Sequence, residues 1–165
     1  MADISALLEK LRANTPGKDT PMETLRKNFS AFYLTHQRDR HPVIHPEPIR
    51  AGLPATWITY PDQNREKAIL FFHGGGFTIG STADHIGLCS RLSAAAGMPL
   101  LGVDYRLAPE FHFPAQVEDA VDAYLFLLGK GFAPSSVVPA GISAGGTLVL
   151  SLLIACRDRH IPLPG

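Results

Sequence analysis

Apolar residues follow two alternating patterns through most of the chain. Continuous apolar runs, which are typical of strands buried on both faces, occupy residues 68–72, 99–103 and 137–140. An amphipathic stretch with helical spacing follows each run, at 84–96, at about 114–129 and at about 144–157. Because strand and helix alternate, we predict a mostly parallel sheet with helices on both faces, so the predicted fold class is α/β.

The N-terminal part has a different pattern. Apolar residues at helical spacing in 3–13, and again from Pro21 onward, predict two amphipathic helices. A proline-rich connector that has room for one edge strand comes next, and 56–60 predicts a further strand. We therefore divide the chain into helices over 1–41 and an α/β domain over 42–165.

Composition narrows the classes of function. The chain is 45% hydrophobic, and its 15 Lys and Arg residues balance 15 Asp and Glu residues, so its charge favours neither nucleic acid nor an anionic membrane. The longest apolar stretch, 148–156, is too short to span a bilayer, and the N-terminus lacks a signal-peptide pattern. Cys89 and Cys156 lack metal-ligand spacing, which predicts two reduced, buried thiols. We expect a soluble, cytoplasmic protein, and no metal or cofactor is implied.

One serine lies in a pattern that carries chemistry. Gly141-Ile142-Ser143-Ala144-Gly145 falls between the strand predicted at 137–140 and the following helix. A Gly-x-Ser-x-Gly turn in that context is typical of a nucleophile elbow, which exposes the serine hydroxyl at a helix N-terminus. A turn of small residues can match this pattern by chance. The strand and helix around it favour Ser143 as a candidate nucleophile.

A glycine loop supports the same chemistry. His73-Gly74-Gly75-Gly76 directly follows the strand predicted at 68–72. Glycines there would let backbone N–H groups reach a substrate oxygen with no side chain in the way. Neither glycine pattern of phosphate-binding loops is present. Together with the elbow, the loop predicts a site that stabilises an oxyanion.

These motifs carry a family resemblance. The glycine loop, the segment "VDYRLAPEFHFPA" at 103–115 and the elbow occur in the same order as in the hormone-sensitive-lipase-like esterases, the bacterial family IV of α/β-hydrolases. The chain resembles that family from about residue 44 to 165, and its N-terminal helices are similar to the family's cap. The resemblance implies an α/β-hydrolase fold that hydrolyses small acyl esters through an acyl-enzyme, without a cofactor.

The resemblance also implies roles for single residues. Ser143 would be the nucleophile, and the N–H groups of Gly74, Gly75 and Ala144 would form the oxyanion hole. His73 would brace the glycine loop and would not be the catalytic base. The residues implied to be structural near the site are His73, Gly76, Arg106 and Glu110.

Two groups of side chains beside the site have alternative interpretations. Arg106 and Glu110 would shape the wall of the site, and we interpret them as an internal charge pair. Four aromatic residues could line an acyl pocket or could simply pack in the interior: Phe29, Phe32, Tyr33 and Phe77.

The sequence departs from the family pattern at three places. Ile142 stands where an acidic residue is usual, and Phe111-His112 replaces a His-Pro pair. Pro139 lies inside the strand that leads to the elbow, where it cannot donate a ladder hydrogen bond. Because this strand should be central in the sheet, Pro139 predicts a local irregularity.

The partners of Ser143 are not evident in the chain. In α/β-hydrolases the acid and then the histidine follow the serine. Asp158 and His160 have this order, but at ~1.5 Å per helical residue they would lie roughly 20 Å or more from Ser143. We therefore expect the N-terminal part of an esterase that is almost inactive alone. Its open strand edge would pair with a missing C-terminal part or with another chain.

Two other interpretations stay open. The chain could be a non-catalytic binding protein, since plant gibberellin receptors resemble the same family and have lost the catalytic histidine. It could also be an inactive remnant without a ligand.

Overall fold

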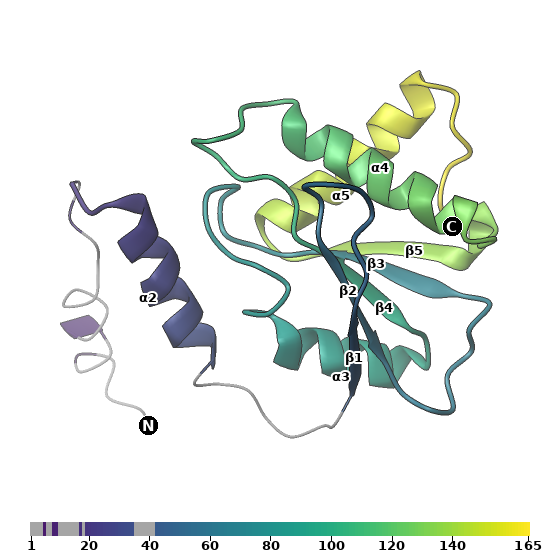
Figure 1. Ribbon diagram of the computed structural model, residues 1–165, viewed down its shortest axis with the longest axis horizontal. Coiled ribbons are helices and arrows are strands. Elements are labelled where there is room, and N and C mark those ends of the chain that lie inside the picture. Colours follow the sequence, from purple (N-terminus) through teal and green to yellow (C-terminus); the bar gives the residue numbers. More distant parts are fainter. Residues whose placement is uncertain (1–4, 6–7, 10–16, 18, 35–41) are drawn as a thin grey trace.

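The computed structural model describes residues 5, 8–9, 17, 19–34 and 42–165. They include a five-stranded sheet in the order β1-β2-β4-β3-β5 (Figure 1). The strands are β1 (Val43–Pro46), β2 (Ala55–Thr59), β3 (Ala68–Phe72), β4 (Leu100–Val103) and β5 (Val137–Gly141). β3 is parallel to β4 and β5, whereas β2 is antiparallel to β1 and β4. The predicted α/β class is confirmed.

The α-helices described are α2 (Met22–Leu34), α3 (Ile86–Ala96), α4 (Ala115–Gly129) and α5 (Ala144–Asp158). The last three cover the two faces of the sheet. Figure 1 shows α3 on one face and α4 with α5 on the other. Gly97 ends α3 in the left-handed conformation that favours glycine. The helix predicted over 3–13 falls mostly on residues outside the description.

The core lies on both sides of the two central strands. All residues of β3 and β4 are buried, as their apolar runs predict. Successive side chains alternate between the faces, so Leu70 and Phe72 join the larger cluster beneath α4 and α5, while Ile69 and Phe71 pack toward α3. Each such side chain contributes about 1.5–3 kcal/mol when fully buried. Both cysteines are free and buried, as predicted, and burial raises the pKa of Cys89 to about 12.

The strand before the elbow is regular, so the irregularity predicted at Pro139 is wrong. β5 pairs with β3 in an unbroken register over its whole length. The N–H of Ile142 donates to the Phe72 carbonyl. Because N–H groups alternate in direction along a strand, the even-numbered residues of β5 point theirs toward β3, and the odd-numbered residues point theirs away from it. Pro139 is odd-numbered, so its missing N–H would have pointed away from β3. Within the described residues that side is a sheet edge, where no ladder bond is lost.

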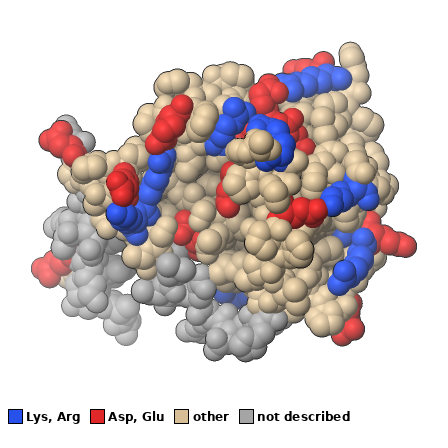
Figure 2. Space-filling model, viewed as in Figure 1, with Lys and Arg blue, Asp and Glu red and all other residues tan. Residues whose placement is uncertain are grey.

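Surface charge is mixed. Figure 2 shows acidic and basic side chains interspersed over the visible face. Oppositely charged side chains also pair at the surface, as Arg159 does with Glu118. None of the helices described is long and apolar enough to cross a membrane. Over the same residues, no three His, Cys, Asp or Glu side chains are grouped to hold a metal ion.

Candidate active site

Ser143 lies at the turn from β5 into α5, where the sequence predicts it. Its backbone has φ 54° and ψ −121°, a conformation that residues other than glycine rarely adopt. The side chain is exposed, and its hydroxyl makes no hydrogen bond to any described group. A strained backbone that presents an unengaged hydroxyl is the geometry of a nucleophile elbow.

Two glycines allow the helix to start so close to the sheet. A β-carbon added to Gly145 would lie 2.0 Å from the Phe72 carbonyl oxygen. One added to Gly141 would lie 2.3 Å from the carbonyl carbon of Gly145. Contacts this short are not tolerated, so the first turn of α5 can approach β3 and β5 only with glycine at both positions.

The glycine loop after β3 lies beside the serine. A β-carbon added to Gly74 would be 3.4 Å from Cβ of Ser143 and 3.0 Å from the Ile142 carbonyl oxygen. Gly75 has φ 126°, and a β-carbon there would be 2.0 Å from the Ile79 carbonyl oxygen. The loop therefore excludes side chains from the space next to Ser143.

Several backbone N–H groups of the glycine loop and the elbow have no acceptor within the described ranges. The N–H groups of four residues donate to no acceptor in the described part of the chain: Gly74, Gly75, Gly76 and Ala144. The Ala144 N–H also belongs to the N-terminal turn of α5, where the helix dipole favours negative charge. These N–H groups are therefore available to an acceptor from outside the described residues.

His73 is engaged with the loop. Its Nδ1–H donates to the Gly74 carbonyl at 2.8 Å, and its ring stacks on Tyr105 with centroids 4.3 Å apart and planes 9° apart. The residue is buried, and burial lowers the pKa of its imidazole despite the raising effects of Gly74 and of Asp104. A neutral, buried ring bound to the glycine loop matches the bracing role that the resemblance implies.

Tyr105 is a site residue that the sequence reasoning missed. Its hydroxyl donates to the His73 carbonyl at 2.7 Å, and its side chain is buried. Burial raises the pKa of the phenol well above its usual range, so the group remains a donor. The sequence held a signal for this role. Tyr105 is the second residue after β4, as Gly74 is the second residue after β3, and neighbouring parallel strands end at the same edge of a sheet.

The predicted charge pair between Arg106 and Glu110 is wrong. Arg106 donates to Asp119 through its side chain, at 2.7 Å from Nη2, and through its backbone N–H at 2.8 Å. Glu110 instead accepts from both terminal nitrogens of Arg26, at 2.8 and 2.7 Å. Arg106 is therefore paired with α4, and Glu110 is paired with α2.

A pocket of about 380 Å³ lies next to the elbow. It is mostly apolar, and the residues that form it include Phe77, Phe111, Phe113, Thr147 and Leu148. Thr147 is one helical turn beyond Ser143, and its N–H donates to the Ser143 carbonyl at 3.2 Å. Of the four aromatic residues considered for an acyl pocket, Phe77 lines this one.

Phe29 is not among the residues that line this pocket. The ring of Phe29 lies against His85, with centroids 6.1 Å apart, which matches the packing interpretation. The side chains of Phe32 and Tyr33 fall outside the described part of the chain.

Comparison with known proteins settles the family. The sequence profile of the α/β-hydrolase fold matches residues 69–165, which is more than half of the chain. The chain belongs to this family. An acetyl-hydrolase of Streptomyces hygroscopicus is 44% identical over 110 residues, which are 67% of this chain and 36% of that protein. An ethyl acetate hydrolase of Pseudomonas putida is 39% identical over 102 residues, 58% of this chain and 32% of its own length.

Solved structures of esterases resemble this chain. An esterase from the bacterial hormone-sensitive lipase family superimposes with a TM-score of 0.88 and 37% identity. The match covers 99% of this chain and 56% of that esterase. The chain therefore spans about half the length of the solved relative and about a third of the curated ones. The resemblance read from the three motifs is confirmed.

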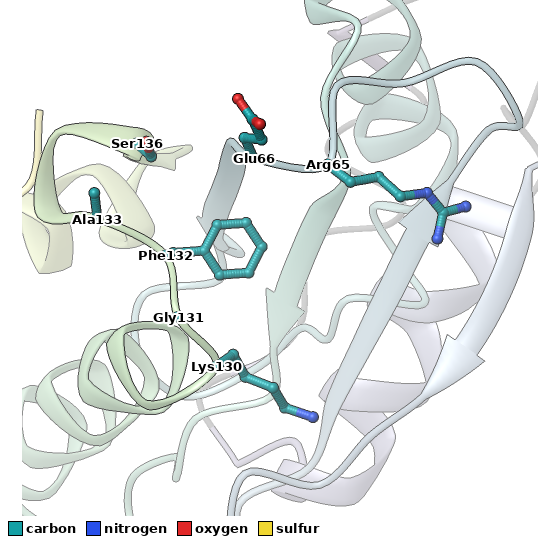
Figure 3. A pocket seen from close by; sticks show the side chains of 7 residues that line it. All are labelled: Arg65, Glu66, Lys130, Gly131, Phe132, Ala133 and Ser136. Carbon is teal, nitrogen blue, oxygen red and sulfur yellow. The ribbon is translucent and has the colours of Figure 1, made fainter.

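A second pocket lies away from the elbow of this α/β-hydrolase. Its volume is about 370 Å³, and its lining comprises Arg65, Glu66, Lys130, Gly131, Phe132, Ala133 and Ser136 (Figure 3). These residues precede β3 and β5, whereas the glycine loop and Ser143 follow those strands. Five strand residues span roughly 16 Å, so this pocket is at the opposite end of the sheet from the elbow. Its Lys130 pairs with Glu47.

Proposed function

We propose that this chain carries the nucleophile and the oxyanion hole of a carboxylic-ester hydrolase. The observation that carries the proposal is the strained, exposed Ser143 beside a glycine loop whose N–H groups have no acceptor among the described residues. The names of two relatives, an acetyl-hydrolase and an ethyl acetate hydrolase, support esters with a small acyl group as substrates.

The geometry supports acyl transfer through a covalent intermediate. Ser143 Oγ attacks the ester carbonyl, and the carbonyl oxygen becomes an oxyanion that accepts from the N–H groups of Gly74, Gly75 and Ala144. The Gly76 N–H adjoins them. Expulsion of the alcohol leaves an acyl-serine, and water then releases the carboxylic acid and restores the hydroxyl. Loss of one oxyanion donor typically lowers kcat ~10²–10³-fold.

We place the base and its acid on an element that covers β5. Within the described residues the outer edge of β5 has no partner strand. Apolar side chains are exposed on β5 and on the outer face of α5: Val138 at 38%, Leu150 at 62% and Ile154 at 52%. Asp158 and His160 lie at the far end of α5 and cannot reach Ser143. A C-terminal part or a second chain on this face would bury it and complete the site.

We also propose that residues 1–41 act as a partial cap on the domain over 42–165. The support is the contact of α2 with the loops that follow β3 and β4, at the end of the sheet where Ser143 lies.

The free, buried cysteines favour a cytoplasmic location.

Hydrolysis of p-nitrophenyl acetate and butyrate by the purified 165-residue chain tests the proposal. We expect a slow rate that falls further in Ser143→Ala and is unchanged in Ser135→Ala, an exposed serine before β5. A fast rate that Ser143→Ala abolishes would place a base within this chain. A rate that Ser143→Ala leaves unchanged would reject Ser143 as the nucleophile. Ester binding without such hydrolysis would favour a non-catalytic binding protein.

A further inference from the structure

We propose that Tyr105 is a positioning residue for the oxyanion hole, and that its hydroxyl and ring together set the directions of the Gly74 and Gly75 N–H groups. The inference rests on the proposed function, because it assumes that these N–H groups receive the oxyanion.

The hydroxyl of Tyr105 acts on the first peptide unit of the loop. A trans peptide unit is planar, and its C=O and N–H bonds point in opposite directions. The hydroxyl donates to the His73 carbonyl at 2.7 Å, and that carbonyl shares its peptide unit with the Gly74 N–H. Fixing the carbonyl toward the buried phenol turns the Gly74 N–H away from the core. Gly74 itself lies against Ser143.

The ring of Tyr105 acts on the second peptide unit. It stacks on the imidazole of His73 with planes 9° apart, and so fixes the orientation of that ring. The oriented imidazole donates from Nδ1–H to the Gly74 carbonyl at 2.8 Å. This carbonyl shares its peptide unit with the Gly75 N–H. One tyrosine therefore determines two successive donors, one by a direct hydrogen bond and one through His73.

The surroundings of Tyr105 hold it in this position. Its ring makes edge contacts with Phe72 and Phe77, with centroids 6.4 and 6.2 Å apart. These residues lie immediately before and after the His73–Gly76 loop. Phenylalanine at position 105 would keep the stack and both edge contacts and would remove only the hydrogen bond to His73. The substitution therefore separates the effect of this hydrogen bond on the N–H directions from the effect of ring packing.

Nuclear magnetic resonance of the chain labelled with ¹⁵N-glycine tests the proposal without turnover. A hydrogen bond to a carbonyl deshields the amide nitrogen of the same peptide unit. Tyr105→Phe should therefore shift the Gly74 ¹⁵N resonance upfield and speed its amide exchange, while Gly75 changes little. Tyr105→Leu, which also removes the stack, should move both resonances.

Hydrolysis that depends on Ser143 gives a second measurement. Tyr105→Phe should lower kcat roughly tenfold and leave KM unchanged. This loss is smaller than the ~10²–10³-fold loss that follows deletion of a donor.

Tyr124→Phe is the matched control. Tyr124 is also buried, and its hydroxyl donates to the Pro162 carbonyl at 2.8 Å, remote from the loop. Tyr124→Phe should leave the ¹⁵N resonances of Gly74 and Gly75 unchanged. The proposal is overturned if the Gly74 resonance does not move in Tyr105→Phe, or if it moves equally in Tyr124→Phe. If Tyr105→Leu does not fold, the Tyr105→Phe result alone decides. The glycine resonances could shift as expected while Ser143→Ala leaves the rate of hydrolysis unchanged. That result would reject the proposed function but would still support the positioning role of Tyr105.

Discussion

Both terminal nitrogens of Arg26 donate to the carboxylate of Glu110, at 2.8 and 2.7 Å, and join α2 to the loop after β4. The same guanidinium also donates from Nε to the Thr78 carbonyl at 3.0 Å, in the segment after the glycine loop. Its Nη2 reaches the Ala108 carbonyl at 3.1 Å. One arginine thus connects the N-terminal helix to both loops that border the candidate site. This connection is the physical basis of the proposed cap.

Replacement of Arg26 should release α2. Arg26→Ala removes all of these bonds, and Arg26→Lys keeps the charge but not the planar fork, so we expect faster limited proteolysis around α2 in both, with Ala the faster. The control is Lys27→Ala, which removes an exposed pair with Glu23 within α2 and should match wild type. Equal cleavage rates in Arg26→Ala and Lys27→Ala would show that Arg26 does not hold the helix.

Two adjacent glycines of α5 should respond oppositely to alanine. A β-carbon on Gly145 would lie 2.0 Å from the Phe72 carbonyl oxygen, so Gly145→Ala should lower the free energy of unfolding by about 1–3 kcal/mol or more. At Gly146 the nearest atom is 3.6 Å away, so Gly146→Ala should be neutral or stabilise the helix by roughly 0.5–1 kcal/mol. Urea unfolding measures both. Similar midpoints would contradict the close approach of α5 to β3.

Acid should destabilise the fold through His73. Burial lowers the pKa of this imidazole in the folded state. Below pH 6.5, the ordinary histidine pKa, the unfolded chain therefore binds a proton that the folded chain excludes, and the stability that neutral His73 contributes is lost as pH falls. Urea unfolding at several pH values between 7.5 and 5 should show this slope, and His73→Gln should reduce it. The same slope in both proteins would mean that other groups cause the acid sensitivity.

The sequence alone predicts the features that are local in the chain. The apolar run at β3 and the glycines around Ser143 have periodicity or spacing that identifies them within a few residues. The link between Arg26 and Glu110 joins positions 84 residues apart, and no short pattern encodes it. Pro139 was misjudged because the direction of its missing N–H depends on the register with β3, which composition does not reveal.

Tyr105 was missed for a related reason. It stood in a recognised motif, but its role depends on which carbonyl its hydroxyl reaches on the neighbouring strand's loop. Contacts of this kind follow from strand order, and the order β4-β3-β5 is known only once the sheet is assembled.

Covalent labelling of Ser143 tests the central claim most directly. A p-nitrophenyl phosphonate imitates the tetrahedral acyl-transfer state, and the donors beside Ser143 should favour its attack even when no base is close. Peptide mapping by mass spectrometry should find a single adduct on Ser143, formed slowly and absent from Ser143→Ala. Ser151, on the same helix with its hydroxyl bound to the Thr147 carbonyl, should stay unmodified. No adduct, or an adduct pattern that Ser143→Ala leaves unchanged, would contradict the assignment of Ser143 as the nucleophile.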